Sequence, residues 1–317
     1  MIDDLKFVQG AVAKKDLAPE LTHFQIKDGR ITGYNGHIAL SSPINLKLDV
    51  VPRAVPLIKA IQSCKETVQI NLTPKGRLSI KSGPFKAFVE CLEEKEFPDL
   101  TPKGETIELD GKLIEHFKLL EPFIAEDASR KWARGILLNG YSAFATNNIV
   151  LIEVWLGYHF PFAVNIPHSA IKELIRIKQE PTSIQLDESI ITFHFSEGRW
   201  LKTQVYTTEW PDLTKILDNP AQPVPCGTDF YDNCEQLIPF TDEHDAVYFN
   251  GEELSTSKHD EQGARFATEN IPTEGAFNLT QLLKLKGVAK TIDFSLYPAP
   301  VLFFGDNIRG AIIGQRI

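Results

Sequence analysis

The segment Glu209-Trp210-Pro211-Asp212-Leu213 has an earlier copy in the chain, Glu96-Phe97-Pro98-Asp99-Leu100, 113 residues before it. Both copies follow segments in which apolar and polar residues alternate, residues 88–92 and 203–206. Such alternation is typical of half-buried antiparallel strands. A strand and a motif that recur together at a long interval indicate an internal repeat, and a repeat decides the architecture before any single element does.

Three Asx-Gly pairs recur at a matching interval. Asp28-Gly29, Asn139-Gly140 and Asn250-Gly251 are each 111 residues apart, and each lies between strand-like segments. Asx-Gly pairs supply the positive φ angles that a type I′ turn requires, so each pair predicts a β-hairpin. The chain is therefore expected to repeat one α+β unit three times.

Each repeat is predicted to contain two helices and mostly antiparallel strands. The first helix of each repeat is expected at residues 4–15, 113–125 and 229–239, and the second at 52–64, at 167–179 and from about 278. The joins fall in turn-rich segments near 101–104 and 219–223. The predicted fold class is α+β, with three repeated domains at residues 1–103, 104–219 and 220–317.

The composition is that of an ordinary globular protein. Hydrophobic residues make up 43% and charged residues 24% of the 317 residues, and 20 Phe, 7 Tyr and 4 Trp exclude wholesale disorder. We expect no signal peptide and no membrane span, because no apolar run approaches about 18 residues. The four cysteines form no CxxC pair and have no close His partner, so we predict buried free thiols in place of a zinc site or a disulfide framework. No metal and no cofactor are expected.

The order of motifs in the second repeat carries a resemblance. A helix and a hairpin are followed by Ala145-Thr146-Asn147-Asn148, by a helix that contains Pro167, and by Glu209-Trp210-Pro211-Asp212. This order resembles the bacterial DNA polymerase sliding clamp, the β subunit or processivity factor, whose second domain carries Ala-Thr-Asp-Gly-His-Arg-Leu and a later Phe-Pro-Asp. The chain departs from that pattern at residues 147–150, and the family's opening strand is expected to be missing. We interpret it as a divergent clamp; a phage or prophage origin is a hypothesis.

The resemblance implies an architecture and a mechanism. Two chains of three domains would close head to tail into a ring whose helices line a hole that encircles double-stranded DNA. Such a homodimer tethers a replicative DNA polymerase without chemistry of its own, in the cytoplasm of a bacterial cell or a phage-infected host. Its contacts would pair an edge of the first repeat, residues 82–88, with one of the third, residues 237–247.

Basic residues concentrate where the second helix of each repeat is expected. Residues 51–66, 167–180 and 278–290 hold nine basic and three acidic residues, although the chain has a net charge of −9. A sliding ring must attract phosphates without reading bases, so this segregation favours DNA binding. Ordinary solvated helix faces are the alternative. The predicted DNA-facing residues are Lys14, Lys15, Lys59, Lys118, Arg130, Lys131, Arg134, Lys172, Arg176, Lys178, Lys284, Lys286 and Lys290.

Two further segments bear on DNA binding. Arg130-Lys131-Trp132-Ala133-Arg134 interleaves basic residues with an aromatic one, which suits phosphate contact with base stacking. A charged loop with one packed tryptophan is the alternative. The first helix of the third repeat is acidic, with Asp229, Asp232 and Glu235, and DNA binding does not account for it.

The resemblance also implies an apolar groove between the second and third domains that takes a short peptide from polymerases and the clamp loader. The family has Pro where Asp218 stands and a larger apolar residue where Ala133 stands, so peptide specificity is expected to differ. Plain core packing is the alternative for Leu151 and Ile313. Carried over by motif, the wall of the groove consists of Ala133, Thr146, Leu151, Leu217, Ala311 and Ile313.

Enzyme motifs are missing from the sequence. It contains no GxSxG elbow, P-loop, Rossmann fingerprint or HExxH pattern. The clusters Glu243-His244-Asp245 and His259-Asp260-Glu261 are interpreted as solvated loop residues, and His37 and His194 have no evident partner. We therefore predict a non-catalytic protein. A repeat-built scaffold that binds protein and does not encircle DNA is the remaining alternative.

Overall fold

The computed structural model describes residues 1–15, 18–93, 97–126, 129–226, 228–259, 261–268, 271–272 and 274–316. Chain contacts divide it into two compact units: Met1–Ile114 with Ser169–Tyr206, and Glu115–His168 with Thr207–Ile317. Each unit thus combines parts of neighbouring predicted repeats, and the three-domain division stays a prediction. Glu96 and Asp260, which belong to two of the motifs above, lie outside the described residues.

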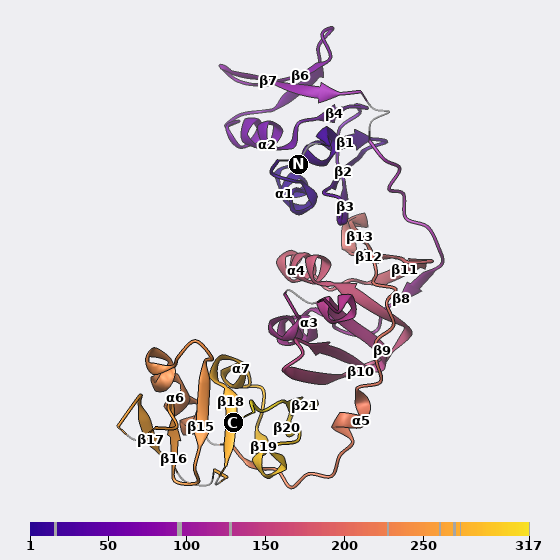
Figure 1. Ribbon diagram of the computed structural model, residues 1–317. Helices are drawn as coiled ribbons and strands as arrows, with labels where there is room; N and C mark the ends of the chain where they lie inside the picture. Colours follow the sequence, from indigo (N-terminus) through magenta and orange to yellow (C-terminus); the bar gives the residue numbers. More distant parts are fainter. Residues whose placement is uncertain are drawn as a thin grey trace. The chain divides into compact units, whose positions relative to one another are not determined.

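The first unit contains a sheet of seven antiparallel strands in the order β1-β2-β3-β13-β12-β11-β8 (Figure 1). The strands β3 and β13 pair directly, with Trp200 opposite Ser41 and Thr203 opposite Ile38. Because these strands come from different predicted repeats, the sheet joins parts of the two repeats in one compact unit. The strands are β1 (Phe24–Lys27), β2 (Arg30–Tyr34), β3 (Ile38–Pro43), β8 (Thr106–Glu108), β11 (Ser183–Asp187), β12 (Ile190–His194) and β13 (Trp200–Gln204).

A second sheet of the first unit has four strands in the order β4-β7-β6-β5. The strand β4 pairs with β7 only at Cys91 and Leu92, whereas β6 pairs with β7 over most of its length. One edge of β7 therefore has no strand partner over Phe85–Glu90 in the described part of the chain. The strands are β4 (Val51–Pro52), β5 (Gln69–Leu72), β6 (Arg77–Ser82) and β7 (Phe85–Leu92).

Amphipathic helices cover this unit. The helix α1 packs on β3 and on α2, and α4 buries Ala170, Ile171 and Leu174, which recur on one helical face. Lys178, just beyond α4, has φ of +58°, the left-handed conformation that ends helices. The elements are α1 (Ile2–Val8), η1 (Gln9–Ala11), η2 (Pro19–Thr22), α2 (Ala54–Gln62), α4 (His168–Ile177) and the 3₁₀ turn η6 (Ser196–Gly198).

The second unit also has two antiparallel sheets, in the orders β14-β19-β20-β21-β10-β9 and β17-β16-β15-β18. The strands of the first sheet are β9 (Gly135–Thr146), β10 (Val150–Pro167), β14 (Val224–Pro225), β19 (Thr291–Asp293), β20 (Val301–Gly305) and β21 (Ile308–Ile312). Those of the second are β15 (Ala246–Phe249), β16 (Glu253–Ser255), β17 (Arg265–Ala267) and β18 (Gly275–Asn278). The antiparallel sheets and short helices of both units confirm the α+β class.

The helices of the second unit are short, and α6 packs against α7. None of the helices in the described ranges is long and apolar enough to span a bilayer. The helices are α3 (Ile114–Leu120), α5 (Thr214–Leu217), α6 (Thr228–Leu237) and α7 (Leu279–Leu283), with 3₁₀ turns η4 (Glu121–Phe123), η5 (Lys131–Arg134), η7 (Ile238–Phe240) and η8 (Phe294–Leu296).

Two of the three predicted Asx-Gly turns are confirmed. Asp28-Gly29 closes a two-residue turn between β1 and β2 with positive φ at both positions, and Asn250-Gly251 lies in the longer turn between β15 and β16. The prediction for Asn139-Gly140 is wrong, because the pair lies inside β9. Strand β10 pairs with β9 both before and after this Asn-Gly pair. The positive φ of Gly140 therefore falls at an irregularity in the β9–β10 pairing instead of in a turn.

The second helix predicted for the third repeat is much shorter than the basic segment 278–290. It begins at Asn278, whose side chain accepts a hydrogen bond from the Gln281 amide, and α7 ends at Leu283. Three predicted DNA-facing lysines, Lys284, Lys286 and Lys290, therefore follow the helix instead of lying on it.

Candidate functional site

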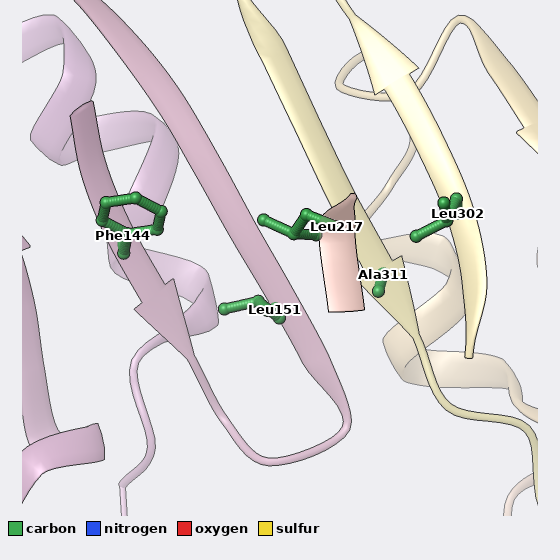
Figure 2. Packing of buried hydrophobic residues seen from close by; sticks show 5 residues of the cluster. All are labelled: Phe144, Leu151, Leu217, Leu302 and Ala311. Atoms are coloured by element: carbon green, nitrogen blue, oxygen red, sulfur yellow. The ribbon is translucent and has the colours of Figure 1, made fainter. Parts of the chain in front are cut away.

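An apolar cluster lies on one face of the six-stranded sheet of the second unit (Figure 2). Leu151 of β10 stands opposite Ala311 of β21, and Ala311 stands opposite Leu302 of β20. Phe144 of β9 and Leu217 of α5 complete the cluster. Three of the residues predicted for the peptide groove, Leu151, Leu217 and Ala311, are thus brought together from three distant parts of the chain.

A second layer of partly buried side chains surrounds this cluster. Trp210, from the repeated Trp-Pro-Asp motif, packs against it and makes an edge contact with Trp132, with 4.9 Å between ring centroids. The motif thus places an aromatic side chain over the cluster, a role that the sequence comparison did not assign. The surrounding apolar residues are Leu137, Trp210, Leu213, Ile216, Ala221, Leu296 and Phe304.

The other predicted groove residues differ in exposure. Thr146 is buried, and its hydroxyl donates to the Val150 carbonyl and accepts from the Asn148 amide, so it shapes the β9–β10 turn. Ala133 is fully buried in η5. Ile313, directly after β21, is 48% exposed. Of the six residues predicted for the groove, five are therefore buried and form its floor, and one, Ile313, is exposed.

Three charged residues, Arg309, Glu153 and Asp218, form ion pairs beside the cluster, and the sequence did not predict them. Arg309 of β21 donates through Nε to Glu153 at 2.5 Å and through Nη1 to Asp218 at 2.8 Å. Partial burial by itself lowers the pKa of the Arg309 guanidinium, but the hydrogen bonds to the two carboxylates and their negative charges together outweigh it and hold the pKa above its ordinary value. The pairing ties the end of α5, and with it Leu217, to the sheet.

Lys14 and Lys15 lie in a basic groove of the first unit, a cavity of about 750 Å³. Five separate segments contribute its walls: the loop after η1, η2 with His23, the start of α2, the β5–β6 turn and the end of β7. In the described part of the chain, one acid lines this groove, Glu90, and it pairs with Arg77 at 3.3 Å. The basic residues of the groove are Lys14, Lys15, Arg53, Lys75 and Arg77. Sequence reading missed Lys75 and Arg77, because a β-turn has no periodic face.

The side chain of Arg176 in α4 binds other groups of the protein. Its guanidinium forms an ion pair with the buried Glu173 and donates through Nη2 to the Phe7 carbonyl at 2.8 Å. The Glu173 carboxylate lies so close to Gly10 that a Cβ there would approach it to 1.9 Å. Arg176 and Glu173 therefore tie α4 to the end of α1, and the guanidinium is committed to protein partners. Three other predicted lysines have exposed side chains: Lys59 of α2, Lys172 of α4 and Lys178, directly after α4.

The lysines after α7 are also committed to protein partners. The Lys286 ammonium lies 2.9 Å from Asp232 and 2.8 Å from Glu235 of α6, and hydrogen bonds to these carboxylates hold its pKa above the ordinary value. Lys290 pairs with Asp306, and Lys284 donates to the Pro122 carbonyl at 2.9 Å. The acidic residues Asp232 and Glu235 of α6, for which DNA binding gave no explanation, therefore pair with Lys286, and the sequence alone did not predict this pairing.

The remaining predicted DNA-facing residues lie on the surface of the second unit. Lys118 of α3 and Arg130, Lys131 and Arg134 around η5 are exposed. Trp132, in the midst of the last three, packs against Trp210 instead of standing free to stack on a base. The alternative interpretation, a charged loop with one packed tryptophan, describes this segment better.

Comparison with known proteins identifies the fold. No protein-family model and no curated protein sequence matches the chain. Among solved structures, it is similar to the DNA polymerase III subunit beta of Pseudomonas aeruginosa (TM-score 0.85, 17% identity) and to the DNA polymerase sliding clamps of Caulobacter crescentus (0.83, 16%) and Bacillus subtilis (0.82, 17%). Each match covers 100% of this chain and 97% of the other. The predicted fold is confirmed: this chain has the sliding-clamp fold over its whole length.

Proposed function

We propose that this protein is a non-catalytic DNA sliding clamp, in which two chains form a ring that encircles duplex DNA and tethers a DNA polymerase. The observation that carries this proposal is the match of the whole chain to 97% of the length of bacterial clamps. A ring around DNA requires no catalytic residue, because its task is to stay topologically linked. Such a ring acts where chromosomal or phage DNA lies, in the cytoplasm.

Two incomplete sheet edges support the homodimer. Among the described strands, the Phe85–Glu90 stretch of β7 has a partner on one side only, and β17 is the last strand of its sheet. Unpaired edges of this kind are templates for pairing with another chain. Exposed apolar side chains accompany these edges: Phe88 lies on β7 and is 55% exposed, and Phe240 of η7, which follows the helix α6 that contacts β17, is 57% exposed.

The dimer contact predicted for the third repeat, residues 237–247, needs a correction. Its end, Ala246–Val247, belongs to β15, which lies between β16 and β18 and is buried. An interior strand has no free edge, so we assign the contact to β17 together with the exposed Ile238 and Phe240 of η7. In the proposed dimer, β7 of one protomer pairs with β17 of its partner, twice per ring.

DNA contact is proposed for the exposed cations that protein carboxylates do not neutralise. A cation paired with a carboxylate contributes little field, whereas an unpaired one releases a counterion from a bound phosphate. The basic groove of the first unit meets this condition best, since its described lining has five cations and one acid, Glu90, which pairs with Arg77. Arg176, Lys286 and Lys290 meet it least. Contacts to phosphates alone would leave binding independent of sequence.

The partner peptide is proposed to bind beside the apolar cluster, at Ile313. A short apolar peptide segment would extend the cluster outward and cover an isoleucine side chain that is 48% exposed. We expect Ile313→Asp to abolish binding of a polymerase-derived peptide and to leave the dimer intact, because the side chain is not part of the packed floor. Fluorescence anisotropy with a labelled peptide measures the first effect and light scattering the second. Val55→Asp, at a similarly exposed apolar residue of α2, is the matched control. Normal peptide binding by Ile313→Asp would refute the assignment.

The proposal is tested by mass in solution and by retention on DNA. Light scattering on a sizing column should give twice the chain mass of 35.6 kDa over a range of concentrations. After loading, the protein should stay on circular DNA and leave the same DNA once it is linearised, since a ring slides off a free end. A dimer that leaves both DNAs equally would contradict encirclement. A persistent monomer that binds protein and no DNA would favour the scaffold alternative.

A further inference from the structure

The sheet face that carries the apolar cluster continues beyond the cluster along β10. Side chains two residues apart on a strand share a face, and so do residues that stand opposite each other on neighbouring strands. After Leu151, the next residues of β10 on this face are therefore Glu153 and Trp155. Leu151 and Ala311 belong to the cluster (Figure 2), and Glu153 stands opposite Arg309. One row thus runs from the cluster through an ion pair to a tryptophan.

Exposure increases along this row. Leu151 is 6% exposed, the Glu153 side chain 13% and Trp155 51%. The residues between them, Ile152 and Val154, are buried on the opposite face of the strand. Because the two kinds of residue alternate, the side chain of Trp155 leaves the sheet by the same face as the cluster.

The Trp155 indole is a large apolar surface with a polar N–H group. Among the residues that the structure describes, none makes a hydrogen bond, a ring contact or a cation–π contact with this side chain. The backbone beneath it is held, since the Trp155 amide donates to the Asn307 carbonyl at 2.9 Å. Tryptophan is among the residue types that most often dominate the binding energy of an interface. Trp155 is therefore suited to contact a partner.

The charges beside the row decide which partner group fits. Arg309 pairs with Glu153 and Asp218, so two carboxylates share one guanidinium, which leaves one negative charge. The Asp218 side chain is the more accessible carboxylate, at 62% exposed. Asp306, next to the residue that holds the Trp155 amide, pairs with Lys290 and adds no net charge. A cationic side chain complements this surface, and arginine fits best because its planar guanidinium both stacks on an indole and donates to a carboxylate.

Strand geometry sets the spacing on the partner. Leu151 and Trp155 are four residues apart in β10, which corresponds to about 13 Å along a strand. An extended peptide beside the row advances by nearly the same length per residue. An arginine about four residues from an apolar anchor therefore reaches Trp155 while the anchor covers the cluster and Ile313.

We propose that the peptide site extends along β10 to Trp155, where an arginine side chain of the partner peptide stacks on the indole. This extension rests on the peptide site proposed above and adds a determinant of specificity to it. Trp155 selects among partner peptides that share the same apolar anchor, and the arginine lies about four residues from that anchor.

Three labelled synthetic peptides test the extension. All have Leu-Phe at the centre as the apolar anchor and Ser and Gln elsewhere. One carries Arg about four residues before the anchor and another about four residues after it, since either direction of the peptide fits the row; the reference peptide carries Gln at both positions. In fluorescence anisotropy with the whole protein, one arginine peptide should bind about threefold to tenfold more tightly than the reference. High salt should reduce this preference.

Variants of the protein then locate the preference. Trp155→Ala should remove it and leave the affinity of the reference peptide unchanged, because the indole lies beyond the apolar cluster. Asp218→Asn should reduce it, and the amide keeps an oxygen acceptor for Arg309. Tyr141→Ala is the matched control: it removes an aromatic side chain of β9 that is 55% exposed and contacts His159. This control should keep the preference.

Four results would overturn the extension. If all three peptides bind equally and Ile313→Asp abolishes their binding, the peptide site stands and the extension fails. A preference that persists in Trp155→Ala would mean diffuse attraction of cationic peptides to a chain of net charge −9. A changed mass of Trp155→Ala in light scattering would place the indole in a contact between two copies of the chain. If no peptide binds the parent protein, the peptide site and its extension fail together.

Discussion

The basic groove of the first unit and the lysines that follow α7 in the second have similar composition and different surroundings. Lys14, Lys15 and Lys75 line a groove. Among the described residues that line it, Glu90 is the one acid. Lys286 contacts both Asp232 and Glu235, and Lys290 contacts Asp306. A count of charges along the sequence treats the two sets alike. The comparison shows that the pairing of each cation, decided by the fold, determines whether its charge is available to DNA.

The largest effect is expected from neutralising the groove. The triple variant Lys14→Gln, Lys15→Gln, Lys75→Gln should lose about tenfold to a hundredfold in affinity for a duplex, with a shallower dependence on salt, because up to three phosphate contacts disappear. Lys284→Gln, Lys286→Gln, Lys290→Gln is the matched control and should lose far less. Anisotropy at several salt concentrations measures both. Equal losses would break the comparison.

A medium effect on stability is expected at Arg176. Arg176→Ala removes the partner of Glu173, whose side chain is 9% exposed, and the donor to the Phe7 carbonyl. We expect the free energy of unfolding to fall by about 1–2 kcal/mol, reduced from a fully buried case because Arg176 itself is 44% exposed. Duplex affinity should stay near that of the parent protein. Urea denaturation measures the first quantity, with Lys59→Ala as an exposed helical control. If Arg176→Ala lost affinity for DNA without losing stability, the original prediction that Arg176 contacts DNA would be supported.

The smallest effect is expected at Lys286 alone. Lys286→Gln should lower the melting temperature slightly at low salt, since Asp232 and Glu235 of α6 then repel each other without a bridging cation. The difference should vanish at high salt, where exposed charges are screened. Differential scanning calorimetry at two salt concentrations checks this. A salt-independent loss would mean that Lys286 acts through packing.

The success of sequence reading varied with the range of the interactions involved. Asp28-Gly29 forms the predicted turn because its φ requirement is local. Asn139-Gly140 does not, because the long partner strand β10 continues past it and its pairing outweighs the turn preference. The prediction of a long helix over 278–290 failed because α7 ends at Leu283. The lysines beyond it meet acids from α6 and β20–β21 that are far away in sequence.

The candidate site shows the same division. The motif positions Leu151, Leu217 and Ala311 meet in one apolar cluster, although Trp210, Phe144 and Leu302 were not anticipated there. Lys14 and Lys15 line a groove, while Lys75 and Arg77 were missed. Whether these residues bind peptide or DNA stays a prediction until the variants are measured.

The sequence by itself determined the α+β class, the amphipathic helices and the order of motifs that resembles the clamp, because periodicity and turn chemistry depend on residues that are close along the chain. Only the tertiary structure decided that the sheets join neighbouring repeats, that α6 neutralises Lys286, and that Lys14 and Lys15 share a groove with Lys75 and Arg77. These features depend on which distant strands pair, and an interaction across a fold leaves no periodic pattern in the sequence.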